Sequence, residues 1–178
     1  MRYGGFWRRS AASLIDGLVL LPFTALLIYA QGFSKEMGIW LSLPAALLFS
    51  SYYIIMHWRY GATVGKRLLS LRVVDEYYER EINFRSALLR GSFYLVFAMI
   101  FSYWEIIGFQ SIPADQYAHL EWYVRDEIVQ SRVPSWSSYV MIASCVWFVI
   151  SFFTLVMTEK KRTLHDYLGS TVVVIVYK

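Results

Sequence analysis

The chain has little of what a metalloprotein or a nucleophilic enzyme needs. Cys145 is the one cysteine among 178 residues, which excludes an intrachain disulfide and a cysteine-based zinc site. The three histidines, His57, His119 and His165, lie far apart in the sequence and offer no local ligand spacing. Neither a nucleophile elbow nor a Ser/His/Asp order is visible. The sequence therefore predicts no enzyme, no metal site and no cofactor.

A phosphate-binding loop is also missing, although the segment Gly61-Ala-Thr-Val-Gly65-Lys66 is similar to one. Such a loop has four residues between its glycines and a serine or threonine after the lysine. Here three residues separate the glycines, and Arg67 follows the lysine. We interpret the segment as a tight glycine turn leading into a basic loop.

Charged residues are scarce and absent from long stretches. Only 17% of residues are charged, whereas 57% are hydrophobic and 19% are aromatic. Four apolar runs, 11–30, 38–57, 88–109 and 138–158, are each about as long as a helix that crosses the roughly 30 Å core of a bilayer. The sequence predicts an all-α membrane protein, a bundle of about four transmembrane helices in contact with the lipid bilayer.

Lysine and arginine mark one side of this membrane. With both termini in the cytoplasm, 14 of the 17 Lys and Arg residues lie on the cytoplasmic side, as the positive-inside rule requires. We therefore predict that both termini are cytoplasmic. This topology also accounts for the net charge of +4, so we expect no nucleic-acid partner.

The segments between the runs have patterns of their own. Alternating apolar residues over 68–74 and the valine-rich segment 171–177 predict two strands that pair in a small cytoplasmic β-sheet. Residues 82–84 are typical of a short return strand. Apolar spacings of three and four over 114–131 predict one outer amphipathic helix. No internal repeat or linker is visible, so we expect a single domain over 1–178.

One acid lies well inside a predicted span. Asp16 is about 7 Å from the start of the first run, where a carboxylate is costly and marks a functional site or a structural charge pair. Arg9 and Ser13 share its helix face, so we expect Arg9 and Asp16 to belong to one charge network, joined by a third group or by water. Glu105 lies nearer a span end and is expected to snorkel to the interface.

Three segments resemble the RDD family of bacterial membrane proteins, named for one arginine and two aspartates. They are Gly5-Phe-Trp-Arg-Arg-Ser-Ala-Ala-Ser-Leu-Ile-Asp16, the basic loop 61–75, and Arg162-Thr-Leu-His-Asp-Tyr-Leu-Gly-Ser-Thr171. The resemblance implies that Arg9, Asp16 and Asp166 are the residues of the name. The supporting residues in the same segments are Ser13, Lys66, Arg162 and His165. The third span and the outer loop depart from the family pattern.

The resemblance implies a location in the bacterial inner membrane and leaves two functions open. The first is transport of ions or small solutes, with exchange of a monovalent cation for a proton at Arg9, Asp16 and Asp166. Pro22 and Pro44, inside the first two spans, favour it because they free backbone carbonyls. Four helices leave little room for a pathway, so a transporter of this size is expected to be a homo-oligomer. The second function is that of a non-transporting accessory or assembly protein, which binds lipid headgroups or a partner membrane protein.

Overall fold

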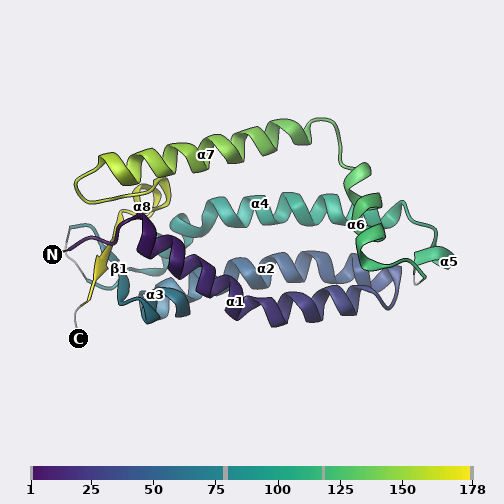
Figure 1. Cartoon of the computed structure of the whole chain (residues 1–178), viewed down its shortest axis with the longest axis horizontal. Coiled ribbons are helices and arrows are strands. Elements are labelled where there is room, and N and C mark those ends of the chain that lie inside the picture. Colours follow the sequence, from purple (N-terminus) through teal and green to yellow (C-terminus); the bar gives the residue numbers. More distant parts are fainter. Residues whose placement is uncertain (1, 78–79, 118, 177–178) are drawn as a thin grey trace. The chain divides into compact units, whose positions relative to one another are not determined.

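Helices make up most of the computed structural model, which describes residues 2–77, 80–117 and 119–176 (Figure 1). Four of them are long and apolar enough to cross a membrane: α1 (Phe6–Gln31), α2 (Lys35–Tyr60), α4 (Phe84–Gln110) and α7 (Ser137–Met157). The four predicted spans are confirmed. The first three extend beyond the apolar runs at both ends because helical hydrogen bonding continues into flanking polar residues.

The chain forms two compact units. Unit 1 comprises Met1–Leu20, Ser51–Phe93 and Met141–Lys178, and unit 2 comprises Leu21–Ser50 and Tyr94–Val140. Fourteen Lys and Arg residues belong to the segments of unit 1, whereas unit 2 has only Lys35, Arg125 and Arg132. The charge asymmetry of the sequence thus coincides with the division into units.

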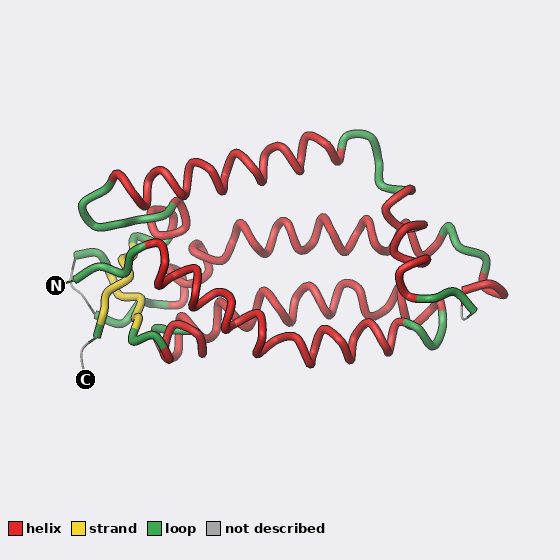
Figure 2. Tube along the Cα trace, viewed as in Figure 1, coloured by secondary structure: helices red, strands yellow, loops and turns green. Residues whose placement is uncertain are grey.

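A two-stranded antiparallel sheet lies in unit 1, as the sequence predicted (Figure 2). Strand β1 (Leu71–Asp75) pairs with β2 (Thr171–Ile175) in a register that sets Val73 opposite Val173. On the other edge of β2, the Gly4 amide donates to the Val173 carbonyl at 2.9 Å. The chain's first residues therefore cover the edge of a valine-rich strand that would otherwise be open to pairing with another chain.

The predicted strand boundaries were partly wrong. Residues 64–68 form the short helix α3 (Val64–Leu68), so the first strand begins at Leu71 rather than at residue 68. Thr63 stops any strand there, because its side chain accepts a hydrogen bond from the Lys66 amide and caps the helix. The second strand ends at Ile175, and Tyr177 lies outside the described residues.

A structural repeat in unit 1 was not visible in the sequence. Each copy consists of a capping threonine, a five-residue helix, a serine with positive φ and a five-residue strand. The first copy has Thr63, α3, Ser70 (φ 57°) and β1, and the second has Thr163, α8 (Leu164–Leu168), Ser170 (φ 50°) and β2. The copies are 100 residues apart, and Val73 and Val173 occupy equivalent positions and face each other. They are thus related by an approximate two-fold axis through this pair.

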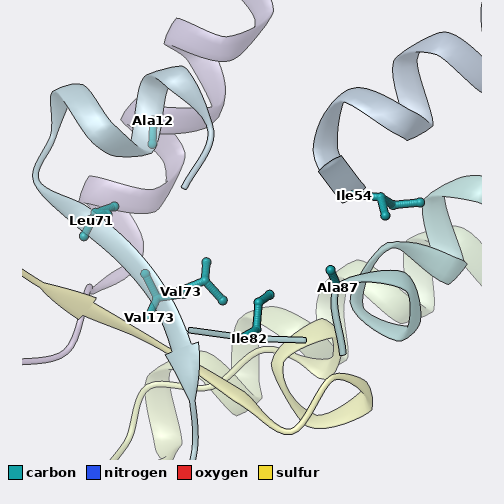
Figure 3. Close-up of a cluster of buried hydrophobic side chains, with 7 residues drawn as sticks. All are labelled: Ala12, Ile54, Leu71, Val73, Ile82, Ala87 and Val173. Atoms are coloured by element: carbon teal, nitrogen blue, oxygen red, sulfur yellow. The ribbon is translucent and has the colours of Figure 1, made fainter. Parts of the chain in front are cut away.

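The core of unit 1 collects apolar side chains from both copies. Figure 3 shows them converging from the two strands, the long helices and the segment before α4: Ala12, Ile54, Leu71, Val73, Ile82, Ala87 and Val173. A Cβ on Gly91 would lie only 2.6 Å from Ile54 Cγ1, so glycine is needed for this approach of α4 to α2. A Cβ on Gly17 of α1, by contrast, would meet no atom of the described residues within 4 Å.

The predicted return strand over 82–84 was wrong. Asn83 Oδ1 accepts a hydrogen bond from the Ser86 amide at 2.7 Å, so the residue caps α4, which begins at Phe84. Ile82 is buried in the core, which explains its apolar character without a strand.

The predicted helix over 114–131 is two helices in unit 2, α5 (Ala114–Tyr117) and α6 (Trp122–Ser131). Tyr117 is fully buried and its hydroxyl donates to the Gln31 carbonyl at 2.9 Å. A new N-terminus follows at Glu121, whose backbone is extended. Anchoring Tyr117 in the interior thus breaks the continuous helix that periodicity predicted.

Candidate functional site

Asp166 is the centre of a charge network in unit 1. Its Oδ2 accepts a hydrogen bond from Arg9 Nη1 at 2.6 Å, and its Oδ1 pairs with Arg90 Nη1. The Thr163 amide and hydroxyl also donate to Oδ2, at 2.9 and 3.0 Å, because Asp166 is the third residue of α8 and completes a capping box with Thr163. One carboxylate therefore joins the start of α1, α4 and the N-terminus of α8.

Both arginines are anchored elsewhere as well. Arg9 donates to the carbonyls of Gly4 at 2.8 Å and Lys161 at 2.6 Å, and Arg90 donates to the Thr171 hydroxyl at 2.6 Å. The Asp166 side chain is fully buried. Burial alone would raise its pKa, but Arg90 and Arg9 hold the pKa well below its ordinary value. Asp166 is therefore a permanently charged, fully bonded carboxylate.

Asp16 is bound by hydrogen-bond donors rather than by a cation. Its Oδ2 accepts from the Thr63 hydroxyl at 2.6 Å, and its Oδ1 accepts from the Gly65 amide at 2.8 Å and the Tyr52 hydroxyl at 3.0 Å. The residue is 1% exposed. A Cβ on Gly65 would overlap the Ala12 carbonyl, so the glycine lets α3 approach α1 closely enough for these bonds to form.

Among the described residues Arg9 and Asp16 bind different partners, and a third group or water that joins them stays a prediction. Arg9 pairs with Asp166, 157 residues away, and the described donors to Asp16 are Thr63, Gly65 and Tyr52. Ser13 does not bridge the two residues either. It is exposed, and its hydroxyl donates to the Arg9 carbonyl within the helix. A shared helix face did not produce a contact because tertiary partners were available to both charges.

Lys66 and His57 form a titratable pair, and Lys66 directly follows Gly65, whose amide donates to Asp16. Lys66 Nζ lies 2.6 Å from His57 Nε2, and His57 is 6% exposed. Burial, followed by the charges of Arg90 and Arg9, lowers the pKa of Lys66 from its ordinary 10.5 to about 7, although Asp166 and Asp16 act in the opposite direction. Lys66 therefore changes its charge near neutral pH.

The repeat places Lys66 and Asp166 at equivalent positions, each three residues after its capping threonine. Lys66 and the charges that act on it form a group of three basic and two acidic side chains: Arg9, Lys66, Arg90, Asp16 and Asp166. Its charges balance when Lys66 is neutral, and it has one excess positive charge when Lys66 is protonated. The proton on Lys66 thus sets the net charge of this buried group.

Arg162 and His165 lie at the edge of the network. Arg162 Nη1 pairs with Glu76 at 2.5 Å, and its Nη2 donates to the Asp166 carbonyl at 3.2 Å. His165 accepts from Trp147 Nε1 at 3.4 Å. Burial and the charge of Arg90 lower the pKa of His165 to about 4, so it is neutral at physiological pH. Both residues support α8 rather than contact Asp16.

The RDD family model matches residues 3–170, nearly the whole chain. The chain belongs to the RDD family. The three residues that carried the resemblance, Arg9, Asp16 and Asp166, all lie inside the match and in unit 1. No curated protein and no solved structure matches the chain.

The partners of this RDD site that the sequence did not predict include Arg90, Thr63, Tyr52 and His57. Arg90 carried the clearest signal, because an arginine inside an apolar span needs a partner. Thr63 and His57 carried no signal of this kind, since both are ordinary residues of a helix end or turn. Within the described residues, no cluster of three or more His, Cys, Asp or Glu side chains could hold a metal ion.

Proposed function

We propose that this RDD protein exchanges protons for monovalent cations across the bacterial inner membrane, with the Lys66–His57 pair as the group that gains and loses the proton. The observation that carries the proposal is the 2.6 Å contact between Lys66 and His57 inside a buried charge group. A perturbed, partly buried titratable pair is typical of a functional site. The role is transport rather than enzymatic catalysis.

The structural repeat supports this choice. Many transporters are built from repeats, and their sites lie at the interface between them. Lys66 and Asp166 occupy equivalent positions in the two copies, and a change at Lys66 alters the charge beside the fixed clamp of Asp166. The pKa of Lys66 is then set by the fixed charges of its neighbours Arg9, Arg90 and Asp16. Four spans suit a homo-oligomeric transporter better than a monomeric one.

Proton exchange can be measured with the purified full chain in sealed vesicles of phosphatidylethanolamine and phosphatidylglycerol containing a pH-sensitive dye. A sodium or potassium gradient is expected to drive a pH change that has its midpoint near the pKa of Lys66, about 7. Lys66→Met should reduce the rate by roughly tenfold or more, because the exchanging group is removed. Lys66→Arg should be equally slow, since its charge does not titrate.

The matched control is Arg85→Gln, which removes an exposed positive charge near the start of α4 and should leave flux unchanged. Folding is checked by unfolding in micelles at several pH values. Between pH 7 and 10.5 the unfolded chain holds the Lys66 proton and the folded chain does not, so stability rises with pH across this window. Lys66→Met should flatten that rise. Wild-type flux equal to that of empty vesicles would contradict transport.

The accessory function has one observation in its favour. Asp166 is fully occupied by two arginines and a helix cap, and Asp16 by three donors, so both acids of the family name serve as structural clamps. An accessory protein would show no flux, and it would copurify with another membrane protein.

The orientation proposed for this function has both termini in the cytoplasm. A single cysteine introduced near Glu127, in a chain with Cys145 replaced by alanine, is expected to react with a membrane-impermeant reagent in intact cells. A cysteine near Arg80 should react only after the cells are opened, because unit 1 holds the basic residues that remain inside. Labelling at Arg80 in intact cells would reverse the orientation.

A further inference from the structure

A polar cavity lies in unit 2, where α6 meets the ends of α1 and α4. Its volume is about 250 Å³, and its polar lining consists of Gln31, Glu105, Tyr117, Arg125 and Asp126. Figure 1 shows α6 crossing the end of α4 rather than running along it, and a Cβ on Gly108 would lie 2.7 Å from the Val129 backbone. This close contact holds α6 in place beside the cavity.

Arg125 lines the cavity and has no counter-ion among the described residues. The residue is 8% exposed, and its guanidinium stands over the Tyr117 ring at 5.1 Å. Nη2 approaches the backbone at Gly32 so closely that a Cβ there would lie 3.1 Å away. In the described part of the chain the guanidinium has neither an ion pair nor a hydrogen-bond acceptor. Because burying an unpaired charge is costly, the cavity favours an anionic group at this point.

Two acids give the same cavity a place for a cation. Glu105 is half-buried and lies close enough to Asp126 for the two charges to interact. Neither forms an ion pair with a Lys or Arg among the described residues. Lys35 donates instead to the carbonyls of Gln110 and Ile112, at 2.8 and 2.7 Å. Glu105 therefore lines the cavity near the end of α4, and its snorkelling to the interface stays a prediction.

A second, more apolar cavity adjoins the first. Its volume is about 540 Å³, and it shares Ile28, Trp122 and Arg125 with the polar cavity. Tyr29 and Phe33, which are 67% and 58% exposed, line its other side. His119 and Glu121 also line this second cavity. Arg125 thus lies between a polar cavity with two acids and a larger, mainly apolar one.

We propose that the two cavities bind a phospholipid with a phosphate and a primary ammonium in its head group, namely phosphatidylethanolamine. Arg125 binds the phosphate, which matches a guanidinium fork in charge and geometry. The ammonium lies between Glu105 and Asp126, and the glycerol and first acyl carbons occupy the apolar cavity. This inference is independent of proton exchange and concerns a different unit of the chain.

Binding is tested with the purified full chain in detergent micelles and dihexanoyl phosphatidylethanolamine as the probe. Ligand binding to the folded state raises the unfolding temperature, and native mass spectrometry counts bound lipids. We expect one bound lipid, with an affinity at least about tenfold above that for dihexanoyl phosphatidylglycerol, which lacks the ammonium. Arg125→Gln should weaken phosphatidylethanolamine binding by roughly tenfold or more.

Two further variants separate the ligand from the fold. Glu105→Gln keeps the side-chain shape and should leave stability nearly unchanged, but it should reduce the preference for phosphatidylethanolamine over phosphatidylglycerol. If Arg125→Gln does not fold, the lipid preference of Glu105→Gln tests the proposal instead. Arg132→Gln, which removes an exposed arginine just after α6, is the matched control and should bind like the wild type.

Equal affinity for the two lipids in the wild type would overturn the proposal, as would unchanged binding in a folded Arg125→Gln variant. Free O-phosphoethanolamine serves as the soluble source of the same head group. If it binds as tightly as the lipid, the apolar cavity contributes nothing and the lipid assignment is wrong. The proposal would be supported if Glu105→Gln lost the preference for phosphatidylethanolamine and Arg132→Gln bound the lipid as tightly as the wild type.

Discussion

Asp166→Asn is expected to destabilise the protein by about 3–5 kcal/mol, because two buried guanidiniums lose the carboxylate that they share. Arg9 and Arg90 are 11% and 8% exposed in their side chains, so water cannot replace the lost partner. The amide also replaces one of the oxygens that cap α8 or pair with arginine. Unfolding of the purified chain in mixed micelles, followed by tryptophan fluorescence, measures the effect.

The matched control for this variant is Glu81→Gln, which removes the surface partner of Arg72. That pair is 42% and 73% exposed, and exposed pairs contribute about 0–1 kcal/mol. Adding Arg90→Met to Asp166→Asn should recover part of the lost stability, since it removes one of the two unpaired charges. If Asp166→Asn lowered the free energy of unfolding by no more than Glu81→Gln does, a stabilising role of Asp166 between Arg9 and Arg90 would be contradicted.

Asp16→Ala is expected to cost several kcal/mol, because it leaves the Thr63 hydroxyl and the Gly65 amide buried without an acceptor at about 1–3 kcal/mol each. Asp16→Asn should cost far less. Its remaining oxygen can accept from Gly65, and the Thr63 hydroxyl can turn to accept from the new amide. Unfolding in micelles should therefore separate the two variants clearly.

If the role of Asp16 were to neutralise Arg9, the stabilities of the Asp16 variants would differ from those expected above. If Asp16 neutralised Arg9, then Asp16→Asn would be strongly destabilising and Arg9→Gln would relieve it. The observed contacts predict instead that Asp16 couples to Thr63 in a double-mutant cycle and does not couple to Arg9. A larger coupling energy with Arg9 than with Thr63 would refute this. Asp16→Asn should also shift the pH midpoint of flux downward, because Asp16 helps to keep Lys66 protonated.

The amino-acid sequence by itself determined the four spans, the membrane environment and the family. These follow from composition summed over long windows, in which about 20 apolar residues in a row leave few alternatives to a membrane helix. The strand pair was also predictable, because 171–175 consists of β-branched residues. Arg9, Asp16 and Asp166 could be named from short local segments.

Tertiary structure alone decided which charges meet. Arg9 could lie near Asp16, seven residues away on one helix face, yet it pairs with Asp166, 157 residues away. Helical periodicity predicts which face of the helix a side chain lies on. It does not predict which residues from other elements lie against that face. The same applies to Arg90 and His57, whose partners Asp166 and Lys66 belong to other elements.

The repeat also became visible only in three dimensions. Its two copies share Thr63 with Thr163, Ser70 with Ser170 and Val73 with Val173, but they differ at most other positions, and Lys66 occupies the position equivalent to Asp166. Backbone geometry needs only a cap, a turn and β-branched residues, which many sequences supply, so the similarity of the two segments is weak. The two copies also contact different long helices: Gly65 of α3 lies close to Ala12 of α1, and Gly169, just after α8, lies close to Ser86 of α4.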